Sequence, residues 1–209
     1  ALSIVLGVSH VDVIGAIDGS APADRLVLLH ERLPRTLLAA TVGASLAAAG
    51  LAFQAVLNNP LADPYIIGVA GGAAIGGTVA MILPIGLLLG QLGVSLSAFL
   101  GGLGAILLTW RLSRDRLGHL RAYQVLLVGV VFNTFASAVI MFLKSVVRAE
   151  KAQEMLLWLM GTLSSDIRAP GAVAASVAVT AVALLALYRL APALNALALG
   201  QEDAATVGV

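Results

Sequence analysis

The residue types that most often carry out chemistry are sparse in this sequence and far apart along it. The 209 residues include no cysteine, so a thiol nucleophile, a disulfide framework and a thiolate metal site are all excluded. The three histidines, His10, His30 and His119, fall in predicted loops, where we expect solvated side chains. The sequence contains no H-E-x-x-H pair, no G-x-S-x-G turn and no P-loop. We therefore predict no catalytic residue, no metal site and no cofactor, and we expect a protein that is not an enzyme.

The most unusual polar cluster is "NNPLADPYIIG", residues 58–68, which places two asparagines, two prolines and an aspartate within seven positions. A residue that precedes proline is displaced from the helical region, so we expect a helix to end near Asn58. A second helix is expected to begin with Pro64 in its first turn. Asp63 is then predicted to be its N-cap, with the carboxylate accepting from free backbone N–H groups. Leu61 is left at the tip of a short, stiff loop.

The composition indicates a membrane protein. Hydrophobic residues make up 60% of the chain and charged residues 11%, well below the quarter or so that is typical of soluble domains. Four stretches without charge reach the ~20 residues needed to cross a bilayer, and one of them, Tyr65–Trp110, is long enough for two passes. We predict an all-α integral membrane protein, a polytopic helical bundle with about five full transmembrane helices after an N-terminal helix stub at residues 1–8. The predicted spans cover residues 35–57, 64–84, 92–111, 122–143 and 169–189.

The segments between the spans set the expected orientation. We predict a polar loop at 9–31, a short connection at 85–91, a charged segment at 144–168 and a polar tail after 189. The loop at 111–121 carries four arginines in a short stretch. Because short basic loops favour the cytoplasmic side, we place this loop, the 58–63 turn and the tail in the cytoplasm. The net charge of +1 gives no indication of nucleic-acid binding.

Small and polar residues within the spans allow two interpretations each. Gly68, Gly72 and Gly76 recur at four-residue spacing, and helix packing through a glycine face is the favoured interpretation. A glycine face lining a substrate path is the alternative. Gln54 and Asn133 are expected to form interhelical hydrogen bonds, and contact with a polar cargo along the transport path is the alternative for both.

Residues 32–74 closely resemble the permeases of type II ABC importers (FecCD/BtuC-like), which carry iron–siderophore, haem and vitamin B12 across the inner membrane. The stretches "LLVGVVFN", "WLMGTLS" and "LALGQEDAATVGV" also fit that family, so the resemblance covers nearly the whole chain. The matching motifs are RLPR at Arg32–Arg35, a small-residue helix at Gly43–Gly50, Gln54, NPLADP at Asn59–Pro64 and a glycine-rich helix start at Gly68–Ala73.

This resemblance implies a multi-pass inner-membrane permease subunit without enzymatic activity of its own. Residues 1–209 would be a single transmembrane domain, the N-terminal portion of a fold of about ten helices, and we interpret the chain as a fragment. The implied partners are an ATP-binding cassette subunit, a periplasmic or lipid-anchored substrate-binding protein, a second permease copy and membrane lipid. The implied mechanism is alternating access driven by ATP binding to the partner subunit.

The resemblance also implies roles for individual residues. Arg32 matches the periplasmic arginine that pairs with a glutamate of the binding protein, and anchoring in lipid headgroups is the alternative. Asn59 and Leu61 match one side of the cytoplasmic gate, and Arg121 and Ala122 match the other side. On that other side of the gate, some family members carry small hydroxyl residues. This sequence departs from them, because it has Arg121 there.

The end of the chain resembles the stretch that leads into the helix that docks on the ATPase. Gln201, Glu202 and Asp203 are therefore expected near the ATPase-coupling loop. Two other classes remain open from the residues alone: a channel, because N-P-L-A is similar to the N-P-A turns of water pores, and a structural membrane protein without ATPase coupling. Which metal chelate is carried does not follow from the sequence.

Overall fold

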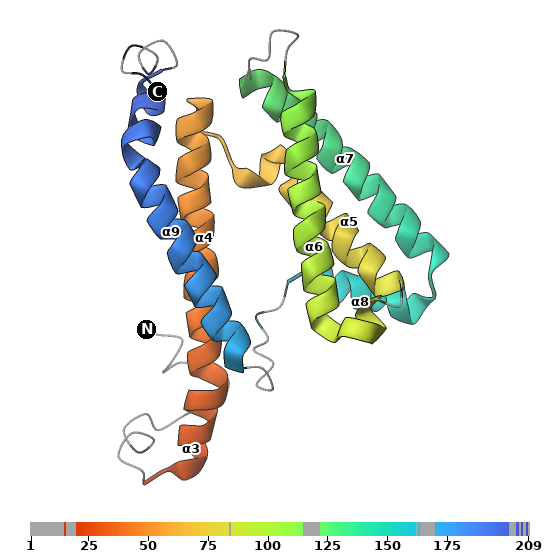
Figure 1. Cartoon of the computed structure of the whole chain (residues 1–209). Coiled ribbons are helices and arrows are strands. Elements are labelled where there is room, and N and C mark those ends of the chain that lie inside the picture. Colours follow the sequence, from red (N-terminus) through yellow and green to blue (C-terminus); the bar gives the residue numbers. More distant parts are fainter. Residues whose placement is uncertain are drawn as a thin grey trace. The chain divides into compact units, whose positions relative to one another are not determined.

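A computed structural model gives the structure of the protein. It describes residues 15, 20–83, 85–114, 122–161, 163, 170–200, 204, 206 and 208. These residues belong to two compact units, one made of Ala1–Ala52 and Leu163–Asn195, the other of Phe53–Thr162 and Ala196–Val209. The elements, drawn in Figure 1, are α3 (Pro22–Val27), a π-helical turn (Leu28–Arg32), α4 (Leu33–Leu57), a 3-10 helix (Pro64–Ile67), α5 (Val69–Ile82), α6 (Ile85–Leu112), α7 (Ala122–Val146), α8 (Ala149–Leu159) and α9 (Pro170–Leu199).

The first unit begins with a helix where part of a loop was predicted. Helical structure is continuous over Pro22–Leu57, so the prediction of a loop at 9–31 is wrong from Pro22 onward. Pro22 occupies the first turn, where a missing N–H costs nothing. A π-helical turn precedes Pro34, and in it the Leu33 N–H donates to the Leu28 carbonyl five residues back. This wider turn shifts the hydrogen-bond register just before Pro34, which has no N–H to donate.

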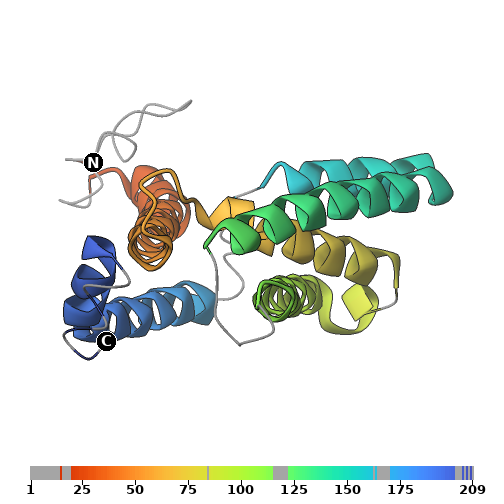
Figure 2. The same ribbon diagram turned by 90° about the horizontal axis from the view of Figure 1, so that it is seen from above.

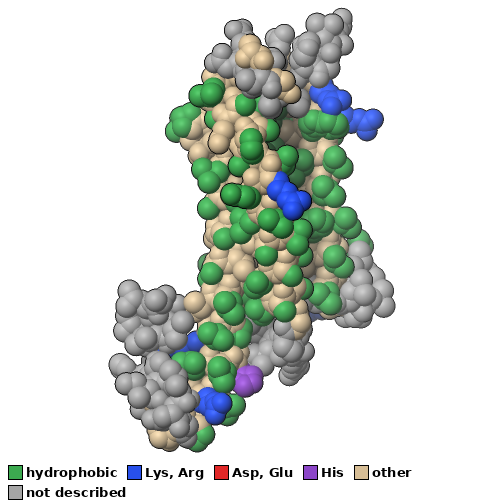
Figure 3. All heavy atoms as spheres, turned by 60° about the vertical axis from the view of Figure 1, so that its left-hand side comes forward, with side chains coloured by type: hydrophobic (Ala, Val, Ile, Leu, Met, Phe, Trp, Pro, Cys, Tyr) green, Lys and Arg blue, Asp and Glu red, His purple; other side chains and the backbone are tan. Residues whose placement is uncertain are grey.

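The second long helix of this unit, α9, extends ten residues beyond the predicted span and ends at Leu199. The predicted polar tail after 189 is therefore wrong up to Leu199, and Pro192 lies inside the helix, as membrane helices tolerate. The hydroxyl groups of Ser45 in α4 and Thr180 in α9 lie 3.1 Å apart. Most of the large hydrophobic side chains of both helices are exposed, and Figure 3 shows hydrophobic side chains spread over the face that it displays.

In the second unit, α5 lies between α6 and α7, as the view from above shows (Figure 2). The glycine face packs on α6: a Cβ on Gly72 would overlap the Gly101 carbonyl oxygen, and one on Gly76 would overlap that of Ser97. This agrees with the packing interpretation for these two glycines. Gly68 has a different role, because it lies before α5 in a left-handed conformation with φ of 94°.

The short helix α8 packs on the same α5. Its Met155 is fully buried with Ala80 and Val94, and a Cβ on Gly77 would overlap the ring of Trp158. Lys151 and Glu154 of this helix form an ion pair of 2.7 Å, with both side chains at least partly exposed. The predicted charged segment at 144–168 thus contains an amphipathic helix.

The prediction of an all-α membrane fold is confirmed, although one span differs in form. Within the described residues, four helices are long and apolar enough to cross a membrane. The span expected at 64–84 is split into a 3-10 helix and the 14-residue α5. At 1.5 Å per residue α5 covers only about 21 Å, less than a ~30 Å hydrocarbon layer. The predicted connection at 85–91 is also helical, because α6 begins at Ile85 and bends at Gly90.

Candidate functional site

The turn after α4 starts from a helix end that is closed by its own backbone. The Asn58 N–H donates to the Ala55 carbonyl (3.2 Å) and the Asn59 N–H to the Gln54 carbonyl (3.1 Å). This is the Schellman pattern, and it requires the left-handed conformation that Asn58 adopts with φ of 45°. The side-chain amide of Gln54 also donates to the Pro60 carbonyl at 3.0 Å. The end of α4 and the loop that follows are therefore tied together.

The tip of the turn is equally well bonded. The Asn59 carboxamide oxygen accepts from the Leu61 N–H at 2.9 Å, and the Asn59 carbonyl accepts from the Ala62 N–H at 3.0 Å. Pro60 takes the second position of this β-turn, where its fixed φ is favourable. Ala62 is buried, whereas the side chain of Leu61 is 83% exposed. A rigid backbone thus carries one apolar side chain outward.

The predicted cap at Asp63 is confirmed, but it caps a different helix. The Asp63 carboxylate accepts from the Tyr65 N–H at 2.8 Å, and the Asp63 backbone is extended. The element that follows is the 3-10 helix Pro64–Ile67, which ends at Gly68 with φ of 94°. Only after this break does α5 begin, so Asp63 and α5 are separated by one turn of 3-10 helix.

Two side chains from other helices bind the backbone on either side of that break. The Asn133 amide nitrogen donates to the Tyr65 carbonyl at 2.9 Å, and its amide oxygen accepts from the Gly71 N–H at 3.3 Å. Only this orientation of the amide works, because a backbone N–H can only donate and a carbonyl can only accept. The buried hydroxyl of Thr109 donates to the Ile67 carbonyl at 3.1 Å.

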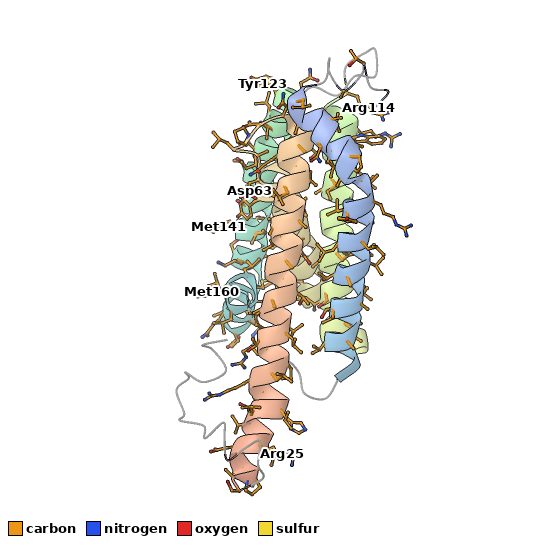
Figure 4. All side chains as sticks on the ribbon, turned by 90° about the vertical axis from the view of Figure 1, so that its left-hand side faces the viewer. Arg25, Asp63, Arg114, Tyr123, Met141 and Met160 are labelled. Carbon is orange, nitrogen blue, oxygen red and sulfur yellow. The ribbon has the colours of Figure 1, made fainter. Side chains whose placement is uncertain are left out.

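The start of α7 lies against the turn. Leu57, Ala62 and Ile67 form a buried cluster, and Ala122 is among the side chains packed on it. Figure 4 places Asp63 toward the end of the second unit that carries Arg114 and Tyr123, away from Met160. The structure therefore brings Ala122 beside the turn that carries Asn59 and Leu61, whereas Arg121 lies outside the described residues.

Other predicted site residues lie elsewhere. Arg32 is half-buried in the π-helical turn of the first unit, 25 residues before Leu57 in the sequence. Gln201, Glu202 and Asp203 are outside the described residues. Next to them, a Cβ on Gly200 would lie 3.9 Å from the Asn58 amide nitrogen, and the nearby Ala204 is buried.

For the expected absence of a metal site, the structure gives information only on the residues that it describes. Among the residues that the structure describes, no three His, Cys, Asp or Glu side chains gather closely enough to hold an ion. His30 lies on the π-helical turn, not in a loop, and is exposed, with Nδ1 3.3 Å from the Leu26 carbonyl oxygen. His10 and His119 are outside the described residues.

Sequence reasoning missed two residues that shape this site, Asn58 and Thr109. The repeated asparagine before Pro60 was a signal for Asn58, because asparagine is the residue after glycine that most readily takes the left-handed end of a helix. Thr109 lies in an otherwise apolar run, and a hydroxyl buried there needs a partner, although its identity depends on the tertiary structure.

The sequence of this chain matches a known protein family and several of its members. The model of the FecCD transport family matches residues 1–209. The cobalamin import system permease protein BtuC of Halobacterium salinarum is 40% identical over 178 residues, covering 85% of this chain and 46% of that protein. The hemin transport system permease protein HmuU of Yersinia pestis is 34% identical, covering 88% of this chain and 54% of that protein.

The fold has a counterpart among solved structures as well. A chain from a metal-chelate type ABC transporter in an inward-facing conformation superposes with a TM-score of 0.80 at 28% identity, covering 100% of this chain and 63% of that one. The chain spans about half the length of the curated relatives it matches.

Proposed function

The chain belongs to the FecCD transport family, and on that premise we propose that it forms part of the permease of a binding-protein-dependent ABC importer. The cargo is an iron–siderophore or a related metal chelate such as haem or cobalamin. A separate ATP-binding cassette subunit supplies the energy, and two permease copies form the pathway. The chain is a multi-pass protein of the cytoplasmic membrane. Among the described residues, four helices are long and apolar enough to cross it.

The observation that carries the proposal is the turn between α4 and the 3-10 helix. A gate needs an apolar side chain that can enter or leave the path, held on a base stiff enough to follow a helix movement. Leu61 is exposed at the tip of this turn, its N–H donates to the Asn59 amide oxygen, and the Gln54 amide donates to the neighbouring Pro60 carbonyl. We assign one side of the cytoplasmic gate to Asn59 and Leu61 and the other side to Arg121 and Ala122.

Movement reaches this gate from the end of α9. Gly200 lies beside Asn58, and the residues after it, Gln201, Glu202 and Asp203, are assigned to the approach to the ATPase-coupling loop. Closure of the ATP-binding subunits would shift this loop and, with it, the turn, as in other rigid-body transitions. Contact of Gln54 and Asn133 with the cargo stays a prediction, and the contacts that support other roles for them are those to the backbone of residues 60, 65 and 71.

Arg32 is assigned to docking of the periplasmic or lipid-anchored binding protein. The membrane span predicted at residues 35–57 separates it from the gate turn, so the two are expected on opposite sides of the membrane. An arginine at that position can pair with an acidic group on a partner. Substitution Arg32→Glu is expected to abolish stimulation by the binding protein, and Arg25→Glu, the same charge change on the exposed start of the helical run, serves as control. Equal stimulation of both variants would refute the docking role.

The test of the function as a whole is reconstitution of the full-length permease with its candidate ATPase and binding protein in proteoliposomes. Uptake of radiolabelled ferric siderophore, hemin and cobalamin is measured with ATP and with a non-hydrolysable analogue. We expect uptake of one of the three that requires both ATP hydrolysis and the binding protein. Uptake at the same rate without ATP would indicate a channel and contradict the proposal.

A further inference from the structure

The first turn of α5 has no cap from its own chain segment. Its N-cap position is Gly68, which has no side chain, so the N–H groups of the first turn need an acceptor from elsewhere. Asn133 of α7 supplies it, because its amide oxygen accepts from the N–H of Gly71, the third residue of the helix. A capping bond that normally comes from the residue just before the helix here comes from a residue 62 positions away.

The same amide also binds the element before the break. Its nitrogen donates to the Tyr65 carbonyl in the 3-10 helix at 2.9 Å. Asn133 therefore spans the break, with one hydrogen bond to each side of Gly68. Thr109 of α6 adds a third bond at the Ile67 carbonyl, so two different helices hold this backbone.

The depth of Asn133 makes these bonds important. It lies about 11 residues from the start of α7 at Ala122, or roughly 16 Å along the helix, about half of a ~30 Å hydrocarbon layer. Irregular backbone at such a depth is tolerated only where it is buried in the protein or lines a water-filled cavity, and here its polar groups are bonded within the protein. The amide of Asn133 is what α7 provides for that purpose.

Close packing adds to the hydrogen bonds. A Cβ on Gly129 would overlap the Ile66 carbonyl oxygen and lie 2.7 Å from the Ile67 Cα, so the 3-10 helix fits against the α7 backbone itself. On the next turn of α7, Phe132 lies 2.9 Å from the position that a Cβ on Gly68 would take. The 3-10 helix therefore contacts one continuous face of α7, made of Gly129, Phe132 and Asn133.

We propose that Asn133 is a positioning residue that joins the gate turn, the 3-10 helix and α5 to α7, so that they move as one body during transport. The proposal rests on the proposed function, because it concerns the gate of the importer. It gives Asn133 a role through the backbone of Tyr65 and Gly71 and not through the cargo. The turn at Asn58–Asp63 leads directly into this joined segment, so a change at α7 is passed on to Leu61.

The experiment compares substitutions at adjacent positions in the full-length permease, assembled with its ATPase and binding protein. Asn133→Leu keeps the size of the side chain and removes both bonds. Asn133→Asp keeps an acceptor for Gly71 and removes the donor to Tyr65. The matched control is Thr134→Val, because among the described residues the Thr134 hydroxyl bonds only the Val130 carbonyl of its own helix, at 3.0 Å.

Two readouts separate a positioning role from a merely structural one. Hydrogen exchange of the peptide covering residues 64–72 is expected to rise about ten-fold in Asn133→Leu, because the Gly71 N–H loses its acceptor and the 3-10 helix, no longer held at the Tyr65 carbonyl, opens more often. Cargo transported per ATP hydrolysed is expected to fall several-fold while the KM for cargo stays unchanged. Asn133→Asp should be intermediate, and Thr134→Val should behave as the wild type.

Wild-type exchange and wild-type coupling in Asn133→Leu would overturn the proposal. A changed KM for cargo with unchanged exchange would also overturn it, in favour of direct contact with the cargo. If Asn133→Leu does not accumulate as folded protein, Asn133→Asp and Thr109→Val are measured in the same way against the same criteria. Failure of the proposed function is distinguishable, because the wild type would then show no ATP-driven uptake although its 64–72 peptide is protected.

Discussion

The two units use similar small residues in opposite surroundings. In the second unit, Gly72 and Gly76 of α5 lie so close to α6 that no Cβ could be added. In the first unit, Gly43 and Gly50 of α4 are also spaced for helix contact, yet no described residue outside their own helix turn lies within 4 Å of an added Cβ. The difference teaches that glycine spacing indicates where helices can approach, whereas the rest of the fold decides where they do.

The largest effect expected from this comparison is that of Gly72→Leu. The side chain would overlap the carbonyl of Gly101, which belongs to helix backbone and cannot move aside. We expect a loss of about 3 kcal/mol or more in the free energy of unfolding, and a large drop in monodisperse full-length protein after detergent extraction. Thermal unfolding followed by size exclusion measures both.

Gly43→Leu is the matched control for that substitution. It adds the same side chain to a glycine of a long apolar helix that is open in this structure. We expect it to shift the midpoint of thermal unfolding far less than Gly72→Leu does. An equal fall in the unfolding midpoint for the two variants would mean that Gly43 is packed as closely as Gly72, which contradicts the difference between the units.

A smaller effect is expected at the contact of α8 with α5. Trp158→Ala removes the ring that lies over Gly77; because this ring is only partly buried, we expect a cost of about 2 kcal/mol, below the ~3–5 kcal/mol of a fully buried tryptophan. Hydrogen exchange of residues 149–160 should increase, while that of α7 stays unchanged. The neighbour Leu157, which is 56% exposed, supplies the control Leu157→Ala. If both substitutions had the same effect on exchange, α8 would not be anchored through Trp158.

Substitutions at Asn58 in the turn test the effect of backbone conformation separately from that of packing. Asn58 has a φ of 45°, and a β-branched residue is strained there, so Asn58→Val should cost about 1–2 kcal/mol. Asn58→Gly removes the same side chain without that strain and should be nearly neutral. Thermal unfolding of the two variants decides the question, and a larger loss for glycine than for valine would contradict the Schellman assignment.

The smallest effect is expected in the first unit. Ser45→Ala removes the hydroxyl contact with Thr180 of α9 at 3.1 Å and a bond of 2.8 Å to the Thr41 carbonyl of its own helix, so only the first is a contact between helices. Hydrogen bonds between membrane helices average about 0.6 kcal/mol, so we expect a loss of that size. A double-mutant cycle with Thr180→Val measures it. A coupling energy as large as the destabilisation by Gly72→Leu would mean that α4 and α9 are held together as strongly as α5 and α6, which contradicts the comparison.

The sequence was sufficient for features that depend on local rules. Long uncharged runs predict membrane helices, and the prolines at 60 and 64 predict a turn with Asp63 as a cap, as the structure confirms. The sequence was insufficient where residues far apart in the chain determine the local backbone conformation. The break at Gly68 persists because Asn133 and Thr109 bond the backbone around it, and they come from helices that follow later in the chain. Two other prolines, Pro34 and Pro192, lie within helical structure, because a π-helical turn and a membrane helix accommodate them.

The most direct test of the central claim, that the Asn58–Asp63 turn is the cytoplasmic gate, uses a single reporter at Leu61. These 209 residues contain no cysteine, so Leu61→Cys introduces one defined thiol at the exposed tip. Its rate of reaction with a bulky maleimide from the cytoplasmic side is measured in the assembled transporter without nucleotide and with ATP trapped by vanadate. The control is Leu112→Cys, an exposed position at the end of α6. We predict that trapping changes the rate at Leu61→Cys about ten-fold and leaves Leu112→Cys unchanged, since burial of the tip restricts access of the reagent. The same rate at Leu61→Cys in both states would contradict the gate.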